Sequence, residues 1–169
     1  QSQKIKNIFT KVLKGHIGVA TYKLKKNTTG KKLDIVARSA LKKAGLDYAH
    51  GTGHGVGYFL NVHEGPQGVG KKGSPVELRA GMVISNEPGY YEADRFGFRC
   101  ENLVLIKQVE SDGNLETLGF ENLTMVPFNT KLLDLDLMTN SEIQWMNDYH
   151  REVYEKISPY LSGDDLDWL

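Results

Sequence analysis

The segment HGTGHGVG, residues 50–57, decides how the rest of the chain is interpreted. Four of its eight residues are glycine and two are histidine. Because glycine permits unusual backbone angles and close approach, this composition favours short strands and tight loops over a helix. The segments NVHEGP (61–66), NEPGYY (86–91) and RCEN (99–102) add further imidazole and carboxylate groups. Such groups are common ligands of manganese, zinc or cobalt, so a metal site is physically reasonable in this part of the chain.

The sequence before this segment predicts two amphipathic helices. Apolar residues recur at three- and four-residue steps over residues 5–19, which indicates a helix with one apolar stripe. The same pattern over residues 33–44 predicts a second helix, and Gly45 stands where a helix commonly stops. Both stripes need another surface to cover them.

The sequence after this segment predicts a sheet followed by one more helix. Short apolar runs punctuated by glycine and proline predict strands at 82–85, at 90–98 around a turn at 92–94, at 103–106 and at 123–128. Thr139 and Glu142 have the spacing of a capping box, and helical periodicity continues from there to Pro159. No repeat or linker divides the chain, so it is expected to form one unit.

Composition narrows the functional classes. Lys plus Arg and Asp plus Glu are 21 each, so no net charge favours nucleic acid as a partner. No apolar stretch is long enough to span a membrane, and the first residues lack a signal peptide and an initiator methionine. We therefore expect the chain to begin within a longer protein. The single cysteine, Cys100, forms no internal disulfide and fits a cytoplasmic location.

The glycine- and histidine-containing segments resemble a known family. Residues 50–57, 59–66 and 87–91 are similar to the signature segments of Xaa-Pro aminopeptidases (aminopeptidase P) of the long eukaryotic type, and the similarity runs from about residue 9 to residue 168. The resemblance implies the C-terminal half of a pita-bread (creatinase/aminopeptidase) fold of class α+β, with outer helices on a curved antiparallel sheet. Residues 1–130 would belong to the catalytic domain and residues 131–169 to a C-terminal helical extension.

The same resemblance implies a pair of divalent metal ions. In the family, two aspartates, one histidine and two glutamates hold the pair, and the matching positions here are His54, Glu87 and Glu101. The two aspartates have no match, because the family places them upstream of the first helix. Two cations repel each other and need several carboxylates, so this fragment is expected to bind metal poorly and to be inactive alone. Mn²⁺ is the expected metal, with Zn²⁺ or Co²⁺ as alternatives.

Further roles follow from the resemblance. Glu87 would relay a proton in addition to ligating, and His50 and His63 would line the substrate cleft as catalytic groups. Tyr91 and Arg99 match positions that support one of the upstream aspartates, so both would lack their usual partner here. Cys100 is expected to be a buried small residue without a catalytic role.

The resemblance implies a metallopeptidase that releases the N-terminal residue from peptides with proline in the second position. Its partners would be such peptides and a second copy of the chain, without nucleic acid or membrane. The aromatic set Trp145, Tyr149 and Tyr154 on the last helix would serve packing or a homodimer contact. Two alternatives stay open: a prolidase, which cuts dipeptides, and a pita-bread binding or regulatory module without peptidase activity.

Overall fold

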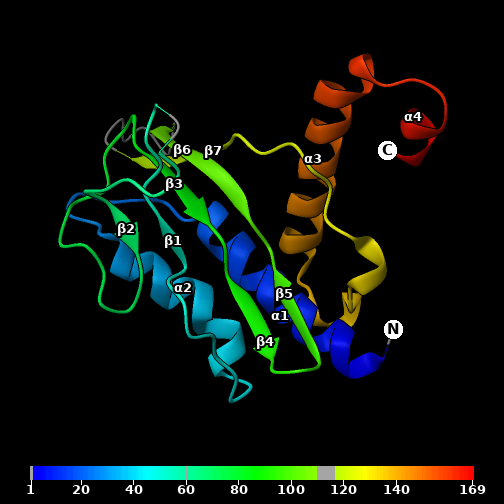
Figure 1. The fold of residues 1–169 in the computed structure, drawn as a ribbon, viewed down its shortest axis with the longest axis horizontal. Helices are drawn as coiled ribbons and strands as arrows, with labels where there is room; N and C mark the ends of the chain where they lie inside the picture. Colours follow the sequence, from blue (N-terminus) through cyan, green and yellow to red (C-terminus); the bar gives the residue numbers. More distant parts are fainter. Residues whose placement is uncertain (1, 60, 110–116) are drawn as a thin grey trace.

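Two helices at the start of the chain pack side by side. The computed structural model describes residues 2–59, 61–109 and 117–169, so Leu60 of the segment 59–66 lies outside the described residues. Helices α1 (Gln3–Ala20) and α2 (Gly30–Lys42) confirm the predicted pair (Figure 1). Their close approach requires Gly15, because a Cβ there would lie 2.1 Å from the carbonyl oxygen of Ala37. Gly45, with a φ of +72°, follows α2 as predicted.

Antiparallel strands form the middle of the chain, as predicted. The short strands β1 (Gly53–His54) and β2 (Gly68–Val69) pair with each other. Strand β3 (Val83–Asn86) pairs with β6 (Asn102–Gln108), which also pairs with β7 (Leu118–Asn122). The hairpin of β4 (Gly89–Glu92) and β5 (Phe96–Arg99) continues from β3 and leads back into β6 (Figure 1). The outer helix α1 packs against β3, β4 and β5.

The prediction of a strand over residues 123–128 is wrong. The strand that pairs with β6 is β7, which ends at Asn122. Residues 123–128 have no regular secondary structure, although the N–H of Leu123 still donates to the carbonyl of Leu103 in β6. Tyr149 explains the difference, because its hydroxyl lies 2.8 Å from the carbonyl oxygen of Val126 and 3.1 Å from that of Thr124. A side chain from the last long helix thus takes the place of a neighbouring strand.

The C-terminal segment contains short 3₁₀ turns and one long helix. The turns η1 (Thr130–Leu132) and η2 (Leu135–Leu137) precede α3 (Asn140–Ile157), and η3 (Ser158–Tyr160) and α4 (Asp164–Trp168) follow it. The predicted capping box is present: Thr139 N–H donates to Glu142 Oε2, and Glu142 N–H donates to Thr139 Oγ1. Helix α3 stands beside the sheet (Figure 1). The boundary at residues 130 and 131 stays a prediction.

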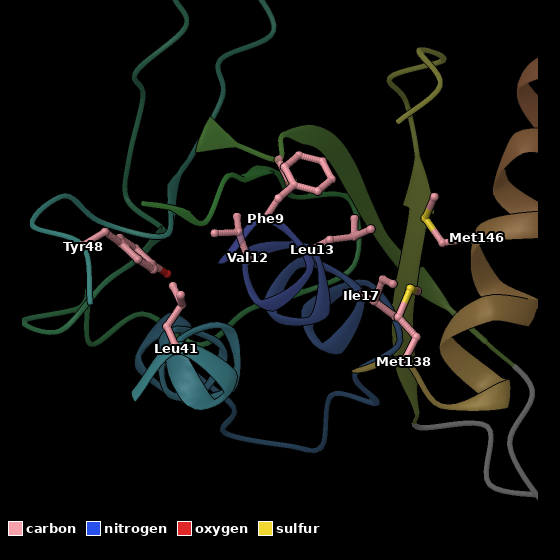
Figure 2. Close-up of a cluster of buried hydrophobic side chains, with 9 residues drawn as sticks. Phe9, Val12, Leu13, Ile17, Leu41, Tyr48, Met138 and Met146 are labelled. Carbon is pink, nitrogen blue, oxygen red and sulfur yellow. The ribbon is translucent and has the colours of Figure 1, made fainter. Parts of the chain in front are cut away.

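The core has two clusters of buried apolar side chains. In the first, side chains of α1 lie between Leu41 and Tyr48 on one side and Met138 and Met146 on the other (Figure 2). The second joins α2 to the sheet through Leu33, Ala37, Ile84 and Val104. These clusters attach both α1 and α2 to the strands that carry the candidate ligands. None of the helices in the described ranges has the length and apolar character that crossing a membrane would require.

Candidate metal centre

His54 ends β1 and has the tautomer that a metal ligand needs. A Cβ at the preceding residue, Gly53, would lie 1.9 Å from the carbonyl oxygen of Ser85, so glycine is what lets β1 approach β3. The His54 Nδ1 atom lies 2.9 Å from the carbonyl oxygen of Gly55. Because a carbonyl only accepts, Nδ1 carries the proton and Nε2 carries the lone pair. That Nε2 lies 3.3 Å from Oε1 of Glu87.

Glu87 follows β3 and is a buried carboxylate with polar contacts at both oxygens. Only 7% of the residue is exposed. Oε1 accepts from Ser85 Oγ at 2.9 Å, and Oε2 lies 3.2 Å from Nη1 of Arg99. The backbone N–H of Glu87 donates to the carbonyl of Thr52 at 2.8 Å, which ties it to the segment 50–57. These contacts satisfy the requirement that a buried charge be paired.

Ser85 supports the site and was missed from the sequence. Its hydroxyl donates to Glu87 and also accepts the backbone N–H of His54 at 2.9 Å, so one side chain holds both candidate ligands. Alternation along β3 puts Ser85 on the same side as Glu87, two residues later. That alternation was the available signal, but a serine in an apolar strand carries no motif of its own.

Glu101 lies opposite Glu87 in the strand pairing. The pair Asn86 and Asn102 of β3 and β6 and the pair Gly89 and Arg99 of β4 and β5 belong to one continuous register. Extending that register across the gap puts Glu87 opposite Glu101, at a Cβ separation of about 5 Å. Glu101 is exposed. Within residues 2–59, 61–109 and 117–169, no three His, Cys, Asp or Glu side chains gather closely enough to hold a metal ion.

The donors therefore fit part of a metal site. The structure brings the side chains of His54 and Glu87 together, and it places Glu101 in register with them without joining its carboxylate to the pair. One imidazole nitrogen and one carboxylate oxygen at this separation suit a shared divalent cation.

The two histidines predicted for the cleft have different neighbours. The ring of His63 is 4.3 Å from that of His54. The ring of His50 lies between Tyr48, at 4.8 Å, and Tyr91, at 5.4 Å. His50 Nδ1 is 2.6 Å from the carbonyl oxygen of Gly51, so its Nε2 carries the lone pair. Within the described residues, that buried Nε2 has no hydrogen-bond partner.

Tyr91 and Arg99 contact each other, and Arg99 also contacts Glu87. Arg99 Nε donates to the Tyr91 hydroxyl at 2.9 Å, and the guanidinium also pairs with Glu87. The hydrogen bond to Tyr91, with the nearby carboxylates, raises the pKa of Arg99. Of the two residues predicted to support an upstream aspartate, Arg99 pairs directly with Glu87 and Tyr91 bonds to Arg99.

His16 of α1 contacts the residues that precede both glutamates, and sequence reasoning missed it. Its Nδ1 lies 3.2 Å from the carbonyl oxygen of Cys100, and its own carbonyl accepts from Asn86 Nδ2 at 3.0 Å. Burial lowers the pKa of His16 to about 4, so the ring is neutral at neutral pH. Cys100 is buried as expected, and burial raises the pKa of its thiol to about 12, which leaves the thiol protonated.

Comparison with known proteins identifies the family of this chain. The model of metallopeptidase family M24 matches residues 1–108, and that of the C-terminal region of peptidase M24 matches residues 116–169. The chain belongs to metallopeptidase family M24. It is 52% identical over 168 residues to a probable Xaa-Pro aminopeptidase P of Coprinopsis cinerea and 46% identical over 168 residues to Xaa-Pro aminopeptidase 1 of Dictyostelium discoideum. Each match covers 95% of this chain but 27% of the relative, so the chain spans about a quarter of their length.

Solved structures confirm the predicted fold class. An X-prolyl aminopeptidase of Caenorhabditis elegans, described as a cytosolic enzyme with a di-nuclear active site, matches 99% of this chain and 28% of its own with a TM-score of 0.92 at 40% identity. An Xaa-Pro dipeptidase of Bacillus anthracis matches 76% of this chain and 33% of its own with a TM-score of 0.61 at 30% identity. The M24 neighbours have the pita-bread fold, and the chain has its mixture of helices and antiparallel sheet.

Proposed function

We propose that this chain supplies part of the dinuclear metal centre of an Xaa-Pro aminopeptidase, which releases the N-terminal residue from peptides with proline in the second position. The observation that carries the proposal is the 3.3 Å approach of His54 Nε2 to Glu87 Oε1, with Glu101 opposite Glu87 in the strand register. The 52% identity to a probable Xaa-Pro aminopeptidase P supports this substrate class.

His54, Glu87 and Glu101 would hold the metal ions. Because two divalent cations repel each other, these residues need further carboxylates, and we propose that two aspartates upstream of α1 supply them. The chain joined to that upstream sequence is called the complete protein below. When bound, two divalent cations activate water and polarise the peptide carbonyl. Mn²⁺ is the proposed metal, with Zn²⁺ and Co²⁺ as alternatives.

The side chains of this chain have separate tasks in hydrolysis. The Glu87 carboxylate, oriented by Ser85 and Arg99, accepts the proton of the attacking water. His50 presents a buried Nε2 lone pair that is free to receive a proton. His63, beside His54, orients the scissile carbonyl. The imidazoles of His50 and His63 pass a proton to the departing prolyl nitrogen.

We also propose that the complete protein is a cytoplasmic homodimer. Tyr149 is buried and stacks on the partly buried Trp145, with ring centroids 5.3 Å apart, so these two residues of the predicted aromatic set pack within the chain. Tyr154, which is 50% exposed on α3, is the member available to a second copy. The cytosolic C. elegans enzyme supports the location.

The test is hydrolysis of an Xaa-Pro-Yaa tripeptide with Mn²⁺ by this chain alone, by the complete protein and by its Glu87→Gln variant. We expect activity only in the unmutated complete protein. Cleavage of Xaa-Pro dipeptides in preference to tripeptides would instead indicate a prolidase, although the dipeptidase of B. anthracis matches less of the chain than the C. elegans aminopeptidase does. A complete protein that neither binds metal nor cleaves peptide would be a binding module.

A further inference from the structure

Arg38 of α2 lies behind the candidate site with a buried guanidinium. Only 1% of the residue is exposed. Its Nε donates to Asp34 Oδ2 at 2.8 Å, and its Nη1 donates to Asp47 Oδ1 at 2.7 Å. The guanidinium also bonds to the backbone: Nη1 donates to the carbonyl of Tyr48 and Nη2 donates to the carbonyl of His50, both at 2.7 Å. A buried ion pair is weak evidence for a stabilising role, because apolar side chains often replace one without loss.

Ring contacts and hydrogen bonds connect Arg38 to the candidate metal ligands. The guanidinium carbon lies 3.8 Å from the centre of the Tyr48 ring, and the centre of that ring lies 4.8 Å from that of the His50 ring, at an interplanar angle of 37°. His50 contacts Tyr91, and Tyr91 accepts the hydrogen bond from Arg99. Arg99 in turn pairs with Glu87. Moving the guanidinium would therefore shift the support beneath the His50 ring.

A second connection runs through the backbone. Asp34, the carboxylate that Arg38 neutralises, accepts from Thr52 Oγ1 at 2.7 Å. The carbonyl of Thr52 accepts the N–H of Glu87 at 2.8 Å. Asp34 and Thr52 are both buried, so neither can exchange these bonds for water without a rearrangement of the core.

We propose that Arg38 is a positioning residue of the candidate site. It fixes the backbone and ring of His50 and, through Asp34 and Thr52, the backbone of Glu87. This inference rests on the proposed function, because His50 has a catalytic task only if the complete protein is a peptidase. The residue acts without touching substrate. A variant that keeps the positive charge beside Asp34 spares the connection to Glu87, so its effect on the reaction should pass through His50.

The experiment is a double-mutant cycle in the complete protein. Arg38→Lys keeps the positive charge beside Asp34 but lacks the planar fork that bonds the carbonyl of His50. The matched control is Leu33→Val, a conservative change at a fully buried position of the same helix that packs in the other core cluster. Tripeptide hydrolysis is measured for each variant with and without His50→Ala. Hydrogen–deuterium exchange of amides 49–55 is measured on the single variants.

We expect Arg38→Lys to lower kcat by about tenfold with KM within about twofold, and to have less than about a twofold effect once His50 is alanine. Leu33→Val should lower kcat by the same factor in both backgrounds. Exchange of amides 49–55 should be faster in Arg38→Lys only.

Equal effects of Arg38→Lys in the two backgrounds, or unchanged exchange of amides 49–55, would overturn the inference. If the unmutated complete protein cleaves no peptide, the proposed function fails. Exchange then decides alone: faster exchange in Arg38→Lys upholds the positioning of this segment, and unchanged exchange rejects it.

Discussion

The two sides of the candidate site are built differently. On the ligand side, Glu87 is 7% exposed, and its carboxylate and backbone bond to Ser85, Arg99 and Thr52. On the other side, Tyr58 and Phe59, in the loop that follows β1, are 99% and 78% exposed. Buried and mutually bonded groups have little freedom to move, whereas exposed aromatic side chains beside a site are suited to contact another molecule. The difference indicates that this chain orients its own candidate ligands but leaves the aromatic side chains of the neighbouring loop uncovered.

The largest effect should come from the centre of the ligand side. We predict that Glu87→Gln in the complete protein lowers kcat by a factor on the order of a thousand or more, because the amide neither carries the negative charge nor accepts the proton. Steady-state hydrolysis of an Xaa-Pro-Yaa peptide measures it, with exposed Glu155→Gln as the control. A loss below about tenfold would remove Glu87 from the chemistry.

The buried side should also make stability depend on pH. The pKa of His16 is about 4 in the folded chain, below the ordinary histidine value of 6.5 that the unfolded chain is expected to have. As the pH falls, the imidazole is therefore protonated in the unfolded chain before it is protonated in the folded chain. The free energy of unfolding keeps its full value with respect to His16 above about pH 6.5. It falls by up to about 3 kcal/mol as the pH is lowered towards about 4. Urea unfolding between these limits measures it, and His16→Gln should flatten the dependence. An equally steep curve in His16→Gln would assign the loss to other groups.

Ser85 should have a smaller effect that is confined to the site. Ser85→Ala removes the donor to Glu87 Oε1 and the acceptor of the His54 N–H. We predict a loss of about 10- to 100-fold in metal affinity or activity, which is typical for a group that orients a ligand. Metal titration and hydrolysis check it against Ser39→Ala, an exposed serine on α2. Equal behaviour of the two variants would contradict the support that the geometry gives to Ser85.

The smallest effect should come from the exposed loop. Phe59→Ala should raise KM by about two- to fivefold and change the free energy of unfolding by no more than about 0.5 kcal/mol, because the side chain packs little in the described structure. Peptide kinetics and urea unfolding measure both quantities. A large loss of stability instead would show that the loop is a packed part of the fold, and the comparison between the two sides would fail.

Local patterns in the sequence predicted most of the fold. Helices α1, α2 and α3 follow from apolar periodicity, and the capping box at Thr139 and Glu142 and the glycine after α2 mark their ends. The strand over 123–128 failed because its polar backbone is satisfied by Tyr149, a residue more than twenty positions away. Periodicity reports only local preference, so it cannot register a tertiary contact of that kind.

The candidate ligands and their supporting residues differ in how far the sequence reveals them. His54, Glu87 and Glu101 lie in segments that resemble a family, and their assignment as ligands remains a prediction. Ser85, His16 and Arg38 carry no such signal, because their relevance comes from contacts with groups distant in sequence or from burial. A histidine within the apolar stripe of α1 is equally compatible with simple packing. Only the folded arrangement separates these roles.

The central claim is that His54, Glu87 and Glu101 form this chain's share of a two-metal site. Mn²⁺ titration of the complete protein, followed by electron paramagnetic resonance, tests it most directly. We predict a spin-coupled pair of ions in the unmutated protein and its loss in each of His54→Ala, Glu87→Gln and Glu101→Gln, with the pair retained in the Glu155→Gln control. A coupled pair that persists in the three ligand variants would contradict the assignment.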